Sequence, residues 1–124
     1  MKKVKAIGVG MPAWIYLNDF GRIIHEAFGE YPYLVGSASR TREWRDVDVR
    51  LILDDEAWER WGFGDAAISN AKWAAFTRAF SELGQKMTGL PIDFQIQQQT
   101  YANDHFKGPR SALGLIWTSE KRGR

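Results

Sequence analysis

Three carboxylates carry the clearest chemical signal in this sequence. Asp46 and Asp48 are separated by one apolar residue, and Asp93 lies far downstream inside another apolar stretch. Side chains two residues apart on a strand point to the same side, so Asp46 and Asp48 are expected to share one face. If the strand that carries Asp93 pairs with theirs, the three side chains converge. Such a cluster repels itself unless protons or cations neutralise it, and its oxygen ligands favour Mg²⁺ or Mn²⁺, which could clamp an in-line displacement at a phosphoryl group.

A glycine–serine turn provides the second half of the expected site. Gly36 and Ser37 follow a short apolar run over residues 33–35. The backbone N–H groups of a small turn and the serine hydroxyl can hold the terminal phosphates of a nucleotide. In the basic loop that follows, Arg40 is the leading candidate to neutralise a departing pyrophosphate, and Arg45 is a second. These residues together predict a metal-dependent nucleotide-binding site.

Helices that support this site are expected over residues 17–28 and 66–83, and a short helix is expected to open at 54–57. In the first, apolar residues recur at three- and four-residue steps, Asn18 or Asp19 is expected to cap the start, and Gly29 to end it. In the second, alanines raise the helix propensity, and Gly84 lies next to the expected end. A buried stripe on that helix is expected from Ile68, Trp73, Phe76, Phe80 and Leu83.

Strands are expected over residues 33–35, 46–53 and 91–97. The last two alternate between apolar and polar residues, which is typical of strands with one buried face. Weaker patterns favour strands at 4–9 and 113–118, and the rest of 98–118 is ambiguous. We therefore predict one α/β (α+β) domain over residues 1–118, with helices packed on a small mixed sheet, followed by a frayed basic tail at 119–124.

The composition excludes several classes of site. The chain has 124 residues, 44% of them hydrophobic, a net charge of +2 and no cysteine. Without cysteine there is no disulfide, zinc–thiolate site or thiol nucleophile, and the small net charge does not indicate a nucleic-acid binder. The N-terminus does not resemble a secretory signal, and no stretch approaches the about 20 apolar residues that span a bilayer. We expect a soluble cytoplasmic protein with no membrane partner.

The ordered set of motifs resembles the polymerase-β-like nucleotidyltransferase superfamily. That family has an apolar strand ending in Gly-Ser, about ten intervening residues, and then a strand of the pattern Asp-hydrophobic-Asp-hydrophobic. Here the first motif is Leu34-Val35-Gly36-Ser37 and the second is Asp46-Val47-Asp48-Val49. The family's third carboxylate lies on a later strand, as Asp93 does. The Gly-Ser-x-x-Arg pattern of small stand-alone members matches residues 36–40, and the resemblance covers residues 17–97.

The resemblance implies an enzyme that transfers a nucleoside monophosphate from a nucleoside triphosphate to a hydroxyl of a protein or nucleic-acid acceptor. Asp46 and Asp48 would bind both Mg²⁺ (or Mn²⁺) ions, and Asp93 would bind the catalytic one and help activate the acceptor hydroxyl. Gly36 and Ser37 would contact the triphosphate. The implied fold is nucleotidyltransferase-like.

Three other interpretations stay open. The chain lacks a separate helical domain to grip an acceptor, so it could be a catalytically weak binding partner in a two-protein regulatory or toxin–antitoxin system. It could be a nucleic-acid-binding module that uses the arginine loop and the basic tail. Finally, Asp46 and Asp48 could be a solvated strand face that forms ion pairs with Arg45 and Arg50.

Overall fold

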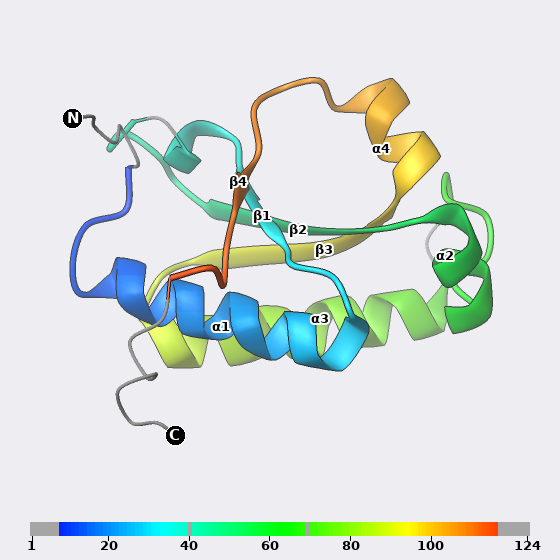
Figure 1. The fold of residues 1–124 in the computed structure, drawn as a ribbon, viewed down its shortest axis with the longest axis horizontal. Coiled ribbons are helices and arrows are strands. Elements are labelled where there is room, and N and C mark those ends of the chain that lie inside the picture. The colour runs from blue at the N-terminus through cyan, green and yellow to red at the C-terminus, as the bar shows by residue number, and fades with distance from the viewer. Residues whose placement is uncertain (1–7, 40, 69, 117–124) are drawn as a thin grey trace.

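The protein is a mixed α+β domain in which helices pack on a small mixed sheet, as the sequence predicted (Figure 1). The computed structural model describes residues 8–39, 41–68 and 70–116. The strands in this part of the chain are β1 (Tyr33–Val35), β2 (Val47–Leu53), β3 (Ile92–Gln98) and β4 (Ser111–Ala112). The helices are α1 (Ala13–Phe28), the 3₁₀ helix η1 (Ser37–Ser39), α2 (Asp55–Trp61), α3 (Ala71–Thr88) and α4 (Gln99–His105).

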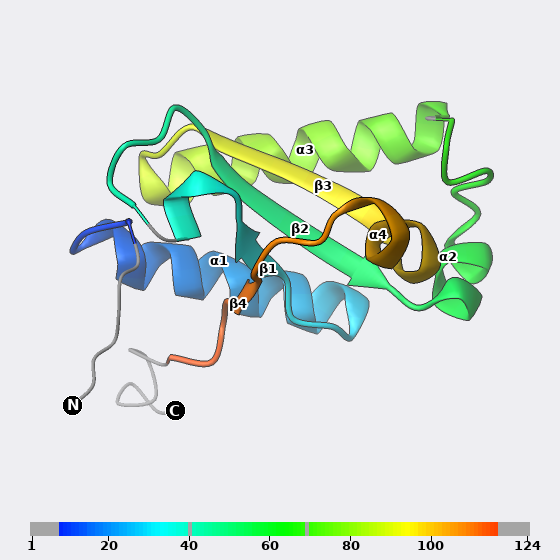
Figure 2. The ribbon, with the colours of Figure 1, turned by 90° about the horizontal axis from the view of Figure 1, so that it is seen from above.

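The sheet brings the starts of two strands beside the end of a third. Its strand order is β3-β2-β1-β4 (Figure 2). Strand β1 is antiparallel to both β2 and β4, whereas β2 and β3 are parallel because α2 and α3 form a long crossover between them. In this register Asp48 lies opposite Asp93 on one side and Val35 on the other. The Gly36 turn therefore follows β1 at the edge where both acidic strands begin.

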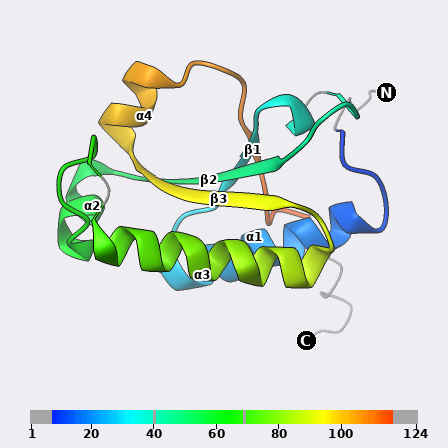
Figure 3. The same ribbon diagram turned by 180° about the vertical axis from the view of Figure 1, so that it is seen from behind.

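The apolar face of β2 and β3 is buried and the polar face is open, as the alternation predicted. On β2 the buried residues are Val47, Val49, Leu51 and Leu53, and on β3 they are Ile92, Phe94 and Ile96. Helices α1 and α3 lie under this face, and α4 lies on the opposite side (Figures 1 and 3). Phe20 of α1 meets Phe94 of β3 edge to face, with ring centroids 6.0 Å apart. This core fixes the orientation of the sheet, so that its polar face points away from α1 and α3.

Helix α1 begins earlier than predicted. It starts at Ala13, directly after Pro12, so the predicted cap at Asn18 or Asp19 is wrong. Asn18 is instead a buried helical residue whose Nδ2 donates to the Trp14 carbonyl and whose Oδ1 accepts from the Gly114 N–H. A contact 96 residues away in sequence cannot be inferred from helix periodicity. The predicted end at Gly29 is confirmed, since its φ of 85° lies in the left-handed region.

Helix α3 is shifted toward the C-terminus relative to its prediction. Asn70 caps it by accepting from the Trp73 N–H, and Gly89 ends it with φ 74°. Gly84 lies inside the helix rather than at its end. A Cβ at Gly84 would lie 3.1 Å from atoms of both Phe20 and Ile92, so tertiary packing leaves little room for a side chain there.

Two members of the predicted stripe are wrong as core residues. Ile68 precedes α3 and is 64% exposed, and Leu83 is 36% exposed. The aromatic members Trp73, Phe76 and Phe80 pack against the core. The shifted start of α3 removes Ile68 from the helix, so its side chain no longer lies on the helical face that the periodicity assigned to it.

The ambiguous region after β3 contains α4 and β4. The predicted strand at 113–118 is wrong for residues 113–116, because β4 ends at Ala112. Gly8 and Val9 form no strand, and the remainder of both predicted strands, like the predicted tail at 119–124, lies outside the described residues. None of the helices in the described chain combines the length and apolar character needed to cross a membrane.

Candidate functional site

Two of the three predicted acidic residues, Asp48 and Asp93, lie at one end of the polar face, and Asp46 precedes β2. Asp48 and Asp93 are register partners on neighbouring parallel strands, so their side chains point to the same side of the sheet. Asp46 is exposed in the bend that leads into β2, two residues before Asp48. Its charge acts on the pKa of Asp48, as does that of Asp93. The structure thus brings Asp48 and Asp93 together as expected, whereas Asp46 lies before β2 rather than on the strand that the sequence assigned to it.

The environment of the Asp48 carboxyl group shifts its pKa. Burial raises the pKa of Asp48 above its usual value, the nearby Arg50 guanidinium lowers it, and the negative charges of Asp93 and Asp46 raise it. The net effect is an increase. A carboxylate whose ionised form is disfavoured in this way is a group that a bound cation would stabilise.

Arg50 links the two strand carboxylates. Its Nη2 lies 3.8 Å from Oδ1 of Asp48 and 3.4 Å from Oδ2 of Asp93. Its Nη1 also donates to the Asp93 carbonyl over 2.6 Å. The Arg50 side chain is only 14% exposed, so this guanidinium is a fixed local positive charge. The interpretation of Asp46 and Asp48 as a solvated strand face predicted an ion pair between Asp48 and Arg50, and this pair is present. Arg45 forms no ion pair with the described residues.

The described acidic residues do not by themselves form a metal site. Among the described residues, no three or more His, Cys, Asp or Glu side chains form a ready-made metal-ligand group. Arg50 provides positive charge to Asp48 and Asp93 from within the protein. A divalent cation that used both carboxylates would therefore compete with Arg50 for them.

Gly36 brings the turn after β1 against Asp48. Its φ of 73° is left-handed, and a Cβ at this position would lie 2.5 Å from Oδ2 of Asp48. The Gly36 carbonyl accepts from the N–H and the hydroxyl of Ser39, which forms the short helix η1. Ser37 begins η1 and is half-buried, and its hydroxyl makes no hydrogen bond within the described chain. The expected proximity of the turn to the carboxylates is thus present.

Substitution of Gly36 tests this close approach. We expect Gly36→Ala to lower the free energy of unfolding by more than the about 1–2 kcal/mol that left-handed backbone costs a residue with a side chain, because its methyl also meets the Asp48 carboxylate. Gly89→Ala is the matched control, since Gly89 has φ 74° and nothing within 4 Å of its Cβ position. Urea unfolding of both variants measures the difference, and equal losses would contradict the contact.

A cleft of about 430 Å³ opens over this face of the sheet. It is lined by Gly36, by residues of β1, β2 and β3 that include Asp48 and Arg50, and by the segment 105–110. Asp46 and Asp93 are not among its lining residues. The segment 105–110 contributes Lys107 and Arg110 to the lining of the same cleft as Asp48. The cleft therefore combines one half-buried carboxylate with cations from two separate segments, β2 and residues 105–110.

The sequence-based site omitted Lys107 and Arg110. The only signal for them was the basic turn Lys107-Gly108-Pro109-Arg110, which is equally typical of a solvated loop. Of the two predicted arginines, Arg40 lies outside the described residues, and Arg45 is exposed at the bend before β2 and does not line the cleft.

Comparison with known proteins adds no relative, because no family model, no curated protein and no solved structure matches this chain.

Proposed function

We propose that this protein is a polymerase-β-like nucleotidyltransferase domain that binds a nucleoside triphosphate with Mg²⁺ or Mn²⁺. One observation carries the proposal: Asp48 lies in register with Asp93 and against Gly36, on the open face of the sheet. That juxtaposition joins the two motifs on which the family resemblance depends. It required a parallel β2–β3 pair and an antiparallel β1–β2 pair, which no single motif specifies.

The donor set suits a hard divalent cation. Asp46, Asp48 and Asp93 offer carboxylate oxygens, which Mg²⁺ and Mn²⁺ prefer. The raised pKa of Asp48 supports a need for added positive charge, and the absence of a side chain at Gly36 lets the turn approach the Asp48 carboxylate closely. Bound there, the cation would neutralise the developing charge on the phosphates.

The proposed reaction assigns separate tasks to the chain's own residues. An acceptor hydroxyl oxygen attacks the α-phosphorus and forms a new P–O bond, while the bond to pyrophosphate breaks. Asp93, whose side chain is 43% exposed, takes the hydroxyl proton. Ser37 donates from its hydroxyl to the triphosphate, and Lys107 and Arg110 balance the charge of the departing pyrophosphate. Arg50 releases one carboxylate when the metal–nucleotide complex binds.

The Arg50 bridge favours a second candidate. An internal guanidinium that already pairs with Asp48 and Asp93 is what a nucleotidyltransferase-like fold without turnover would retain. In that case the protein is a catalytically weak binding partner in a two-protein system. The two candidates differ in whether the carboxylates hold a divalent cation.

A thermal-shift panel of ATP, GTP, CTP and UTP with and without MgCl₂ tests the proposal. A ligand that binds only the folded protein raises its midpoint, and at 100 times its dissociation constant it adds about 2.7 kcal/mol. We expect at least one nucleotide to raise the midpoint only when Mg²⁺ is present. Asp46→Asn should remove this shift. Glu26→Gln, on α1 at the opposite side of the sheet, should keep it. If no nucleotide gives a Mg²⁺-linked shift, the proposal fails.

A further inference from the structure

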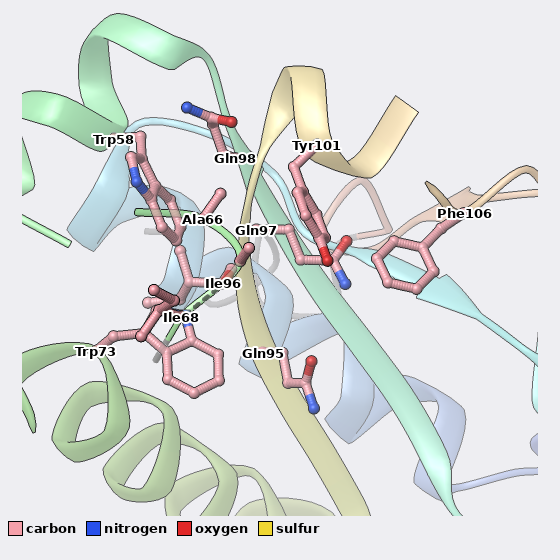
Figure 4. A pocket seen from close by; sticks show the side chains of 11 residues that line it. Trp58, Ala66, Ile68, Trp73, Gln95, Ile96, Gln97, Gln98, Tyr101 and Phe106 are labelled. Atoms are coloured by element: carbon pink, nitrogen blue, oxygen red, sulfur yellow. Dashed lines mark hydrogen bonds between the residues drawn. The ribbon is translucent and has the colours of Figure 1, made fainter. Parts of the chain in front are cut away.

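A second cavity of about 330 Å³ lies along β3, the edge strand of the sheet (Figure 4). It begins at Gln95 and reaches Gln98 at the end of the strand. Three of its lining residues, Gln95, Gln97 and Phe106, also line the cleft that contains Asp48. The two cavities are therefore neighbours that share part of their walls.

Aromatic side chains form the walls of this second cavity. Trp58 and Trp73 lie on one side of Gln97 and Tyr101 and Phe106 on the other (Figure 4). Backbone hydrogen bonds fix both indoles, since Nε1 of Trp58 donates to the Gly64 carbonyl over 2.6 Å and Nε1 of Trp73 donates to the Ile96 carbonyl over 2.7 Å. The walls are thus preorganised rather than adaptable.

Tyr101 is also held in place. Its ring stacks on the ring of His105, one turn later in α4, with centroids 4.0 Å apart and an interplanar angle of 15°. The Nδ1 atom of His105 lies 2.9 Å from the Tyr101 carbonyl oxygen, which fixes the imidazole. A planar ligand that stacked on Tyr101 would therefore meet a ring whose orientation is already set.

The polar lining of the cavity has unused hydrogen-bonding capacity. The side chains of Gln95, Gln97 and Gln98 are half-buried and make no hydrogen bond to another described residue. Each amide offers both donors and an acceptor. Apolar surface is exposed at the same cavity, where Ile68 is 64% and Phe106 50% exposed. Unpaired amides beside exposed apolar groups favour a ligand that is both flat and polar at its edge.

We propose that this aromatic cavity binds the base of the nucleotide whose phosphates occupy the neighbouring cleft. Aromatic side chains bind bases by stacking, and a glutamine amide can pair with the donor–acceptor edge of a base. Gln97 lies four residues beyond Asp93 on β3, or about 13 Å along the strand. The ribose of the bound nucleotide would lie between the base at Gln97 and the phosphates in the cleft. This assignment rests on the proposed function for the phosphate end.

The test compares three kinds of ligand in the presence of Mg²⁺ by calorimetric titration. These are the four common nucleoside triphosphates, inorganic tripolyphosphate, and the four matching nucleosides. The variants are Tyr101→Ala, Tyr101→Phe and Gln97→Ala. Tyr16→Ala is the matched control, because Tyr16 is an exposed tyrosine on α1, away from both cavities. The unfolding midpoint of each variant shows whether it is folded.

We expect one triphosphate to bind wild-type protein at least about tenfold more tightly than tripolyphosphate, because stacking of one base contributes on that scale. Tyr101→Ala should remove about tenfold or more of that affinity and leave tripolyphosphate binding unchanged. Tyr101→Phe should restore the loss, and Tyr16→Ala should cause none. Gln97→Ala should weaken the binding of the triphosphate but not that of tripolyphosphate. If Tyr101→Ala does not fold, the result for Gln97→Ala tests the base assignment in its place.

The possible failures are distinct. If a triphosphate and tripolyphosphate bind equally, or if Tyr101→Ala and Gln97→Ala both bind the triphosphate as wild type does, the base assignment is overturned and the proposed function stands. If only nucleosides bind, and Tyr101→Ala abolishes that binding, the base assignment stands and the proposed function falls. If no ligand of any kind binds, both are overturned.

Discussion

Asp48→Asn is expected to lower the rate of nucleotidyl transfer about 1000-fold or more. Metal ions that clamp a phosphoryl group supply several kcal/mol of charge stabilisation, and each about 1.4 kcal/mol corresponds to a factor of ten in rate. Asp48 is the acid that lines the cleft, contacts the Gly36 turn and lies in register with Asp93. Its loss should therefore disturb the metal, the nucleotide and the second acid together.

The same substitution should not unfold the protein at neutral pH. Burial raises the pKa of Asp48, so its ionised form is less favourable in the folded chain than in the unfolded chain. This destabilisation is absent below the ordinary pKa of an aspartate, develops as the pH rises through the raised pKa, and is fully present at neutral pH. Asparagine cannot ionise, so Asp48→Asn should unfold at an equal or higher urea concentration than wild type at pH 7 and lose that advantage in acid.

Two measurements decide this prediction. Pyrophosphate release, with the nucleotide and acceptor that give turnover in wild-type protein, reports the chemistry, and urea unfolding at two pH values reports the fold. Glu26→Gln provides the matched change of a carboxylate to an amide on the far side of the sheet. Turnover by Asp48→Asn within tenfold of wild type would exclude Asp48 as a metal ligand in the reaction.

Arg50→Met is expected to make the stability of the protein depend on Mg²⁺. In metal-free buffer we expect the free energy of unfolding to fall by about 1–3 kcal/mol, the range for hydrogen bonds to charged groups. Arg50 contacts the carboxylates of Asp48 and Asp93 and the Asp93 carbonyl, and its side chain is only 14% exposed. Methionine keeps the unbranched apolar stem but removes the positive charge. The carboxylates then lack their internal cation, so added Mg²⁺ should restore most of the lost stability.

Urea unfolding of wild type and Arg50→Met with and without MgCl₂ measures this coupling. Arg78→Met is the matched control, because Arg78 forms an ion pair with Glu82 at 3.3 Å in which both side chains are largely exposed, at 83% and 64%. Such surface pairs are worth about 0–1 kcal/mol and should show no dependence on Mg²⁺. If Mg²⁺ stabilises Arg50→Met no more than wild type, the carboxylates hold no divalent cation, and the binding-partner hypothesis is favoured over the enzyme.

The strands that carry the acids were predictable because their signal is local. Alternation with period two requires only that one face be buried; β2 follows it over seven residues, and β3 follows it from Ile92 to Gln97. Helix boundaries were less predictable because distant contacts fix them. The buried side chain of Asn18 bonds to Gly114, and the buried Gly84 packs against Phe20 and Ile92. A periodic pattern contains no information about such partners.

For the candidate site, residue types came from local motifs and their partners came from the fold. The Gly-Ser turn and the Asp46–Asp48 pair are recognisable within a few residues. Three features could not be recognised from the local sequence. They are the bridge from Arg50 to Asp93, the cations of Lys107 and Arg110 at the cleft, and the aromatic cavity beside Gln97. The first depends on the pairing of β2 with β3, and the other two depend on helix α4 and the segment after it, whose sequence has no clear period.

The sequence by itself therefore determined which faces of β2 and β3 are polar and which carboxylates they carry, because side-chain direction on a strand follows from position alone. Only the tertiary structure decided which acids are neighbours and which cation lies between them. Strand order and register are set by packing across the whole core, and a shift of one residue between β2 and β3 would have placed Asp93 opposite a buried valine instead of Asp48.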